Sequence, residues 1–197
     1  MKRIGIFGSS FNPIHLGHLI IADQSIQRLN LEKVLFVPTK SPYHKNSEIL
    51  PYEVRYKMAC IEADKHDKIE VSDVEKSIEG NSYTYDVIKL IENDYPNTRF
   101  YFIMGSDSLV NFHTWYKYEK LIDKMGFVIF KRPEDEDISE LIRRYRDLGM
   151  EIYYYEDIQI QISSTFIRNS IRDEKSVRYL LSDKIIDYIE SNGYYGI

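Results

Sequence analysis

One stretch carries most of the information about the fold: Gly8-Ser9-Ser10-Phe11-Asn12-Pro13-Ile14-His15-Leu16-Gly17-His18. It follows a strand-like run over Lys2–Phe7 and leads into a stretch over Leu16–Asn30 whose apolar residues recur with the period of one buried helix face. A glycine between a strand and a helix lets the backbone approach a ligand. The helix N-terminus beyond it offers free amide groups and a positive dipole end. The stretch therefore predicts an anion site.

Two histidines lie in this stretch, His15 and His18, three residues apart. If both lie in the first helical turn they point to one side, and Gly17 leaves the backbone between them uncovered. Two imidazoles beside a phosphate site can donate hydrogen bonds to phosphate oxygens. The alternative is that one histidine only caps the helix or packs against it.

Outward from this stretch, strand-like and helical patterns alternate. Further strands are expected at Lys33–Val37, Lys68–Ser72, Arg99–Met104, Gly126–Phe130 and Glu151–Tyr155. Helices are expected near Tyr52–Lys65, from Ser82-Tyr83-Thr84 to Asn93, after Gly105-Ser106-Asp107 to Lys124, near Ile138–Leu148 and over most of the last stretch. Strands separated by helices predict parallel pairing through right-handed crossovers.

The fold class is therefore α/β, with a doubly wound, mainly parallel sheet. A length of 197 residues predicts one domain over 1–197, with a helical C-terminal segment over 163–197 packed on it. In such sheets ligands bind beyond the carboxyl ends of the strands, where the strand order reverses. The turns after the first, second and fourth strands are the places to search.

Composition narrows the function classes. Lys plus Arg (26) against Asp plus Glu (31) leaves a net charge of −5, the wrong sign for a protein held to nucleic acid by its overall field. The apolar runs Phe100–Met104 and Met125–Phe130 are too short to span a bilayer. We expect a cytoplasmic protein without nucleic-acid or membrane partners. One cysteine excludes an intrachain disulfide and a multi-cysteine zinc site.

Other phosphate and hydrolase motifs are absent from the sequence. It contains no Gly-Lys-Ser/Thr of a P-loop, and Gly5-Ile6-Phe7-Gly8 lacks the third glycine of a dinucleotide fingerprint. It also contains no His-Glu-x-x-His zinc motif and no Gly-x-Ser-x-Gly nucleophile elbow.

Further short motifs follow the His-x-Gly-His of the first turn along the whole chain. They are Pro42-Tyr43-His44-Lys45, Ser82-Tyr83-Thr84, Gly105-Ser106-Asp107, Trp115-Tyr116, Lys131-Arg132-Pro133 and Ile162-Ser163-Ser164-Thr165-Phe166-Ile167-Arg168. In these motifs and their order the chain resembles the bacterial nicotinate-mononucleotide adenylyltransferases, members of the nucleotidyltransferase superfamily with the His-x-Gly-His motif. The family usually has a second glycine at Ser9 and an aspartate at Asn12, where asparagine can still form a local side-chain turn.

The resemblance implies an enzyme of NAD biosynthesis with a Rossmann-like fold. It would transfer AMP from ATP to the 5′-phosphate of nicotinate mononucleotide, forming deamido-NAD and pyrophosphate. Mg²⁺ would accompany ATP as the cofactor, with no metal ligand assigned to the chain, and a homodimer is compatible with the family. The catalytic residues implied are His15, His18, Lys45 and Arg168.

The resemblance also distributes binding residues over the two substrates. ATP would contact Gly8, Ser9, Ser10, Phe11, His18, Gly105, Asp107, Ile162, Ser163, Ser164, Thr165 and Arg168. Nicotinate mononucleotide would contact His44, Lys45, Thr84, Trp115 and Tyr116. Ser164 and Thr165 are expected to cap the helix that carries Arg168. Asp107 could instead only cap a helix, and Trp115 could belong only to the core.

Thr84 at a helix start would present donors to the nicotinate carboxylate, which predicts a preference for the acid mononucleotide over the amide. Two alternatives stay open. One is an adenylyltransferase with another acceptor, nicotinamide mononucleotide or phosphopantetheine. The other is a non-catalytic nucleotide sensor with the same fold.

Overall fold

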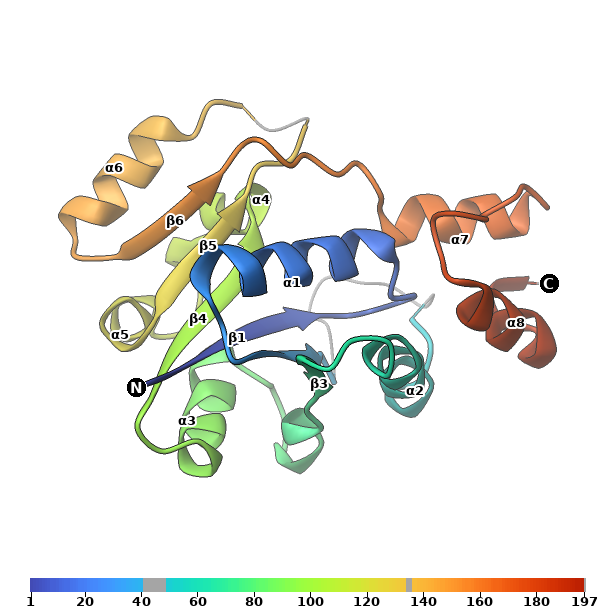
Figure 1. The fold of residues 1–197 in the computed structure, drawn as a ribbon, viewed down its shortest axis with the longest axis horizontal. Coiled ribbons are helices and arrows are strands. Elements are labelled where there is room, and N and C mark those ends of the chain that lie inside the picture. The colour runs from blue at the N-terminus through green and yellow to red at the C-terminus, as the bar shows by residue number, and fades with distance from the viewer. Residues whose placement is uncertain (41–48, 134–135, 197) are drawn as a thin grey trace.

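The centre of the molecule is a six-stranded, wholly parallel sheet (Figure 1). The computed structural model describes residues 1–40, 49–133 and 136–196. The strands are β1 (Lys2–Ser9), β2 (Lys33–Pro38), β3 (Ile69–Val71), β4 (Thr98–Gly105), β5 (Gly126–Phe130) and β6 (Glu151–Tyr155). Their order is β3-β2-β1-β4-β5-β6, so the winding direction reverses between β1 and β4. The predicted doubly wound α/β fold is confirmed.

The helices cover both faces of this sheet. One face carries α1 (Leu16–Leu29), α2 (Tyr52–Ala63), α7 (Ser164–Arg172) and α8 (Asp183–Asn192). The other carries α3 (Thr84–Asp94), α4 (Ser106–Val110), α5 (Tyr118–Lys124) and α6 (Ser139–Asp147). Successive strand residues alternate between the two cores, as Phe7 and Ile6 do. Both faces are apolar because both are buried.

The first strand is longer than predicted. Gly8 and Ser9 pair with Val37 and Pro38 of β2, so the turn that follows β1 starts at Ser10. Beyond the carboxyl end of β1, the chain passes through this turn into α1 and lies close to α7 (Figure 1). This turn, residues 10–15, is called the phosphate turn below because an anion site is predicted there. It lies between a central strand and two helices of one face.

The helical region expected after Gly105-Ser106-Asp107 to Lys124 is not one continuous helix. The structure has α4, then a short 3₁₀ turn η2 (Phe112–Thr114), and then α5. Phe112 is fully buried, with its ring 5.1 Å from that of Phe127, and Lys117 before α5 has a left-handed φ of 54°. Seating this aromatic side chain in the core requires a change of chain direction that a continuous helix cannot make.

The C-terminal segment is mainly helical, as predicted. It contains α7, α8 and the 3₁₀ turn η3 (Tyr194–Gly196). Between α7 and α8 the chain is not helical, with an isolated bridge between Arg178 and Leu181. Within the described ranges, no helix is long and apolar enough to cross a membrane.

Candidate active site

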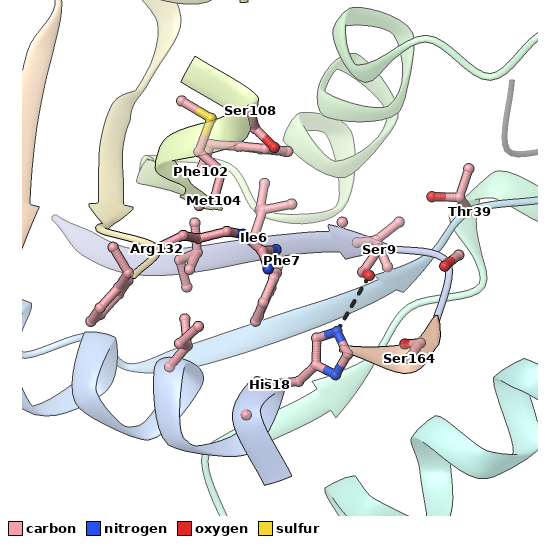
Figure 2. Close-up of a pocket in the computed structure, with 18 of the residues that line it drawn as sticks. Ile6, Phe7, Ser9, His18, Thr39, Phe102, Met104, Ser108, Arg132 and Ser164 are labelled. Atoms are coloured by element: carbon pink, nitrogen blue, oxygen red, sulfur yellow. Dashed lines mark hydrogen bonds between the residues drawn. The ribbon is translucent and has the colours of Figure 1, made fainter. Parts of the chain in front are cut away.

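A pocket of about 400 Å³ lies at the carboxyl ends of the central strands. The ends of β1, β2, β4 and β5 contribute Ser9, Val37, Gly105 and Phe130 to its lining, and α7 contributes Ser164 (Figure 2). The reversal of strand order between β1 and β4 creates this crevice, since the connections from the two strands diverge to opposite faces. The pocket therefore lies beside the turns after the first, second and fourth strands, where a ligand site was predicted.

The two histidines stack on each other at the N-terminus of α1. His15 is the N-cap and His18 the third residue of the helix, and their ring centroids are 3.7 Å apart. The backbone N–H of His15 donates to Nδ1 of His18 (3.2 Å). Because Nδ1 accepts this bond, the proton of a neutral His18 ring lies on Nε2. That Nε2 atom lies 3.5 Å from Ser9 Oγ in the pocket (Figure 2). The structure thus presents an N–H donor to the pocket.

The His15 ring is uncharged at neutral pH. Burial, with a smaller contribution from the positive charge of Arg132, lowers the pKa of His15 to about 3. A Cβ atom at Gly17 would lie 3.0 Å from His15 Nδ1 and 3.1 Å from the side chain of Ile160. A side chain at this position would therefore crowd the His15 ring and Ile160, which corrects the expectation that this backbone is uncovered.

Behind the histidines, Phe11 closes the turn from the protein interior. Its side chain is fully buried, its φ is 46°, and its ring stands edge-on to that of His18 at 5.0 Å. Phe11 belongs to the core and does not line the pocket. Its contact supports the His18 ring from behind.

The start of α7 forms one wall of the pocket. Ser163 is the N-cap, and its Oγ accepts from the backbone N–H of Phe166 (3.1 Å), so the expectation that Ser164 and Thr165 cap the helix is wrong. Ser164 Oγ donates to the carbonyl of Pro13 (2.9 Å). The cap lies one residue earlier because the Ser164 hydroxyl bonds the phosphate turn. The wall is lined by Ile162, Ser163, Ser164 and Thr165.

Arg168 of α7 is buried behind this wall. Its Nη1 donates to the carbonyl of Asn12 (2.9 Å) and its Nη2 to Thr165 Oγ1 (3.3 Å). The guanidinium therefore holds the phosphate turn, and the side chain is not part of the pocket lining. Direct contact between Arg168 and phosphate stays a prediction.

The opposite wall follows β4 and β5. Arg132 Nε donates to Asp107 Oδ1 (2.9 Å), and the Arg132 backbone N–H donates to Ser106 Oγ (2.8 Å). A Cβ at Gly105 would overlap Asp107 and lie 2.8 Å from Arg132 Nε. Gly105 therefore makes room for this ion pair. Gly105 and Arg132 line the pocket, whereas Asp107 lies outside the lining.

Comparison with known proteins then decides the family. The cytidylyltransferase-like family model matches residues 6–170. A protein of Clostridium tetani described as a probable nicotinate-nucleotide adenylyltransferase is 34% identical over 99% of this chain and 100% of its own length. One of Fusobacterium nucleatum with the same description is 36% identical over 95% of this chain and 97% of its own length. The chain belongs to the nicotinate-nucleotide adenylyltransferase family.

A solved structure agrees with this family assignment. The Plasmodium falciparum nicotinic acid mononucleotide adenylyltransferase, complexed with NaAD, has a TM-score of 0.83 and 25% identity, covering 99% of this chain and 98% of its own. A second structure of that enzyme, complexed with APC, has a TM-score of 0.81 at 24% identity and shows the same fold.

In this adenylyltransferase, aromatic and apolar side chains also line the pocket, among them Phe102 and Met104. Trp115 lines it and also packs into the core, with its ring 5.5 Å from that of Phe102 and nearly perpendicular to it. Trp115 therefore both lines the pocket and packs against the core, and its contact with nicotinate mononucleotide stays a prediction. Thr84 is the first residue of α3, and it lines the pocket as predicted. Tyr116 lies outside the lining, with its ring 4.5 Å from that of Tyr83.

Several lining residues of this family member were not predicted as site residues, although Ser82 and Arg132 belong to motifs quoted from the sequence. These lining residues are Thr39, Glu75, Ser82, Ser108 and Arg132, among others. Thr39 directly follows β2, a turn that the topology rule does indicate. Glu75 has no such signal, because it comes from a 3₁₀ turn, η1 (Val74–Ser77). It is 5% exposed, accepts from the backbone N–H of Lys40 (2.7 Å), and has a pKa raised by burial. His44 and Lys45 lie outside the described residues.

Proposed function

We propose that this chain transfers AMP from ATP to the 5′-phosphate of nicotinate mononucleotide, forming deamido-NAD and pyrophosphate. The observation that carries the proposal is the pair His15 and His18 at a helix N-terminus inside the pocket. Full-length relatives described as nicotinate-nucleotide adenylyltransferases support the choice of acceptor.

For this reaction the protein has to align the two phosphates and stabilise the charge that develops on the leaving pyrophosphate. A phosphate oxygen of the mononucleotide forms a bond to the α-phosphorus of ATP, and the bond between that phosphorus and the pyrophosphate oxygen breaks. The nucleophile is already an anion, so no general base is needed. His18 Nε2–H would donate to the reacting phosphates, and the N-terminus of α1 would add its amide groups and dipole.

The triphosphate would lie between the phosphate turn and α7. Ser164 and Thr165 line this wall, and the helix N-terminus there again favours negative charge. Lys131 and Arg132 also line the pocket and are proposed as cations that neutralise phosphate oxygens. Arg168 would support the turn from behind. Lys45 is proposed as a further cation on the strength of the family resemblance alone.

Mg²⁺ is proposed to arrive with ATP. Among the described residues, no three His, Cys, Asp or Glu side chains gather as a metal site. The pocket donors nearest the phosphate turn are an imidazole and hydroxyls, which suit phosphate oxygens. Mg²⁺ commonly takes several of its ligands from water and substrate phosphates, and when bound with ATP it would supply positive charge beside the phosphate oxygens.

The acceptor pocket favours an acid over an amide. Thr84 places the N-terminus of α3 at the pocket, and this end of a helix offers N–H donors and a positive field. A carboxylate accepts hydrogen bonds only, whereas a carboxamide also carries donors that have no acceptor at a helix N-terminus.

We expect release of pyrophosphate from ATP only with a pyridine mononucleotide, and a higher kcat/KM for nicotinate mononucleotide than for nicotinamide mononucleotide. The measurement follows pyrophosphate and the adenylated product with both mononucleotides and, as a control acceptor, phosphopantetheine. Equal values for acid and amide would contradict the role of the α3 N-terminus. Protein that binds ATP but uses no acceptor would favour the sensor alternative.

A further inference from the structure

Asn12 is a residue of the phosphate turn that is hydrogen-bonded to distant parts of the chain. Its side chain is 1% exposed, and its Oδ1 accepts two hydrogen bonds, from the hydroxyl of Tyr195 (2.9 Å) and from the backbone N–H of Leu50 (3.2 Å). The Asn12 side chain is thus bonded to two distant segments of the chain, and the local side-chain turn expected for it stays a prediction. Its own carbonyl accepts from Arg168 (2.9 Å).

Tyr195 reaches Asn12 from the far end of the chain. It is the second residue of η3, is 9% exposed and has a left-handed φ of 67°. Burial raises the pKa of its hydroxyl, so the group stays protonated and donates to Asn12. A buried hydrogen bond thus ties the last turn of the protein to the turn that precedes the histidines.

Ser10, two residues before Asn12, is also hydrogen-bonded to a buried side chain from a distant element. Arg55 of α2, 1% exposed, donates to the carbonyls of Ser10 (2.6 Å) and Leu50 (2.8 Å). Between Ser10 and Asn12, Phe11 has the left-handed φ of 46°. A non-glycine residue keeps such a conformation only where its surroundings impose it. The shape of the turn is therefore decided by side chains that arrive from α2, α7 and η3.

We propose that Tyr195 is a positioning residue for adenylyl transfer, acting through Asn12 on the turn that carries His15 and His18. The inference rests on the proposed function. Asn12 lies three residues before His15, with Pro13 and Ile14 between, so a shift of Asn12 is passed directly to the N-cap of α1. Tyr195 does not line the pocket, and its hydroxyl donates to Asn12 in this turn, so the bond to Asn12 is the contact through which we expect it to act on catalysis.

The substitution Tyr195→Phe removes only the hydroxyl. We expect kcat to fall about tenfold, since a small displacement of groups that align phosphates is costly and one buried hydrogen bond is lost. The KM for nicotinate mononucleotide should change less than about twofold. Tyr194→Phe is the matched control, because Tyr194 is the adjacent residue and its ring packs on Tyr188 (5.8 Å). It should keep the wild-type kcat.

The route through the turn is tested by combining variants. In a His18→Ala background, Tyr195→Phe should cost less than about twofold, because the donor that it positions is gone. Asn12→Ala should reproduce the loss of Tyr195→Phe, and the two together should not be additive. A full tenfold loss in both backgrounds would overturn the proposal. So would an unchanged kcat with a lowered unfolding temperature, which is the pattern of a purely structural hydroxyl.

A calorimetric measurement of ATP affinity separates this inference from the proposed function. Tyr195→Phe should weaken ATP binding severalfold, and Tyr194→Phe should not. If the wild type binds ATP but forms no product with nicotinate mononucleotide, the proposed reaction fails while the binding comparison still tests Tyr195. Equal ATP affinities of the wild type and Tyr195→Phe would count against the positioning role.

Discussion

His15 and His18 share a motif but differ in environment. Burial lowers the pKa of His15, whereas His18 is oriented by the bond that its Nδ1 accepts from the His15 backbone. The tautomer that results presents an Nε2–H donor to the pocket. A sequence motif with two histidines therefore contains one pocket donor of defined orientation and one ring that supports it by stacking.

We predict that His18→Ala lowers kcat by about 10²-fold or more, since removing one donor that stabilises developing charge has an effect of this size. The readout is pyrophosphate release at saturating ATP and nicotinate mononucleotide. His66→Ala is the control, because His66 contacts Asp23 (3.3 Å) and does not line the pocket. A His18→Ala variant with near wild-type kcat would contradict the role of this residue.

Ser9 shows how the chain tolerates a change in the family motif. Ser9 is the last residue of β1 and pairs with Pro38 of β2. It is not among the described residues that have a positive φ. Serine is thus accommodated without left-handed strain, and its hydroxyl gains a contact with His18 Nε2. The left-handed residue of the turn is Phe11, whose conformation is imposed by the packing around it.

Among the elements, α7 couples stability to the site. Its N-cap Ser163 lines the pocket, and the next residue, Ser164, donates to Pro13 of the phosphate turn. Because the N-terminus of α7 both lines the pocket and bonds the phosphate turn, fraying of this end would disturb the turn. The N-cap serine is therefore expected to matter for substrate binding as well as for folding.

We predict that Ser163→Ala lowers the free energy of unfolding by about 1 kcal/mol and raises the KM for ATP severalfold. Urea denaturation and initial rates measure the two effects. Ser182→Ala is the matched control: Ser182 caps α8 and also bonds Glu62, but it does not line the pocket. It should lose stability with an unchanged KM. A raised KM in both variants would mean that lowered stability alone explains the effect.

At the scale of the whole molecule, folding keeps a histidine neutral in the interior. The pKa of His15 is about 3 in the folded chain, against an ordinary value of 6.5 for histidine. Between these values the unfolded chain binds more protons than the folded one, so the free energy of unfolding rises with pH in this window. Acidification below about pH 6.5 therefore destabilises the protein through His15.

We predict that this histidine accounts for a loss of about 1.4 kcal/mol in the free energy of unfolding between about pH 7.5 and about pH 5.5. His15→Asn lacks the titrating ring and should lose less stability by that amount over the same interval. Urea unfolding of both proteins at the two pH values measures the difference. Equal losses in the two proteins would show that His15 is not the group responsible.

How much could be predicted differs between the fold and the site. Periodicity predicted all six strands and their parallel pairing, because buried strands and amphipathic helices carry their pattern locally. It did not predict the break in the helical region between Asp107 and Lys124, where the buried Phe112 lies in a 3₁₀ turn between two short helices. For the site, the histidines, Thr84 and Trp115 were predicted, whereas Glu75 and Tyr195 were not, since their places depend on contacts across the chain.

Local sequence was enough to predict the fold class and to point to the turn after the first strand, because strand, turn and helix signals all lie within a few residues of each other. How that site is held depends instead on tertiary packing. Arg55 bonds Ser10 across 45 residues of sequence. Asn12 is bonded by Arg168 across 156 residues and by Tyr195 across 183 residues. No local pattern records such contacts, since they arise when the packed helices bring distant side chains to the same buried turn.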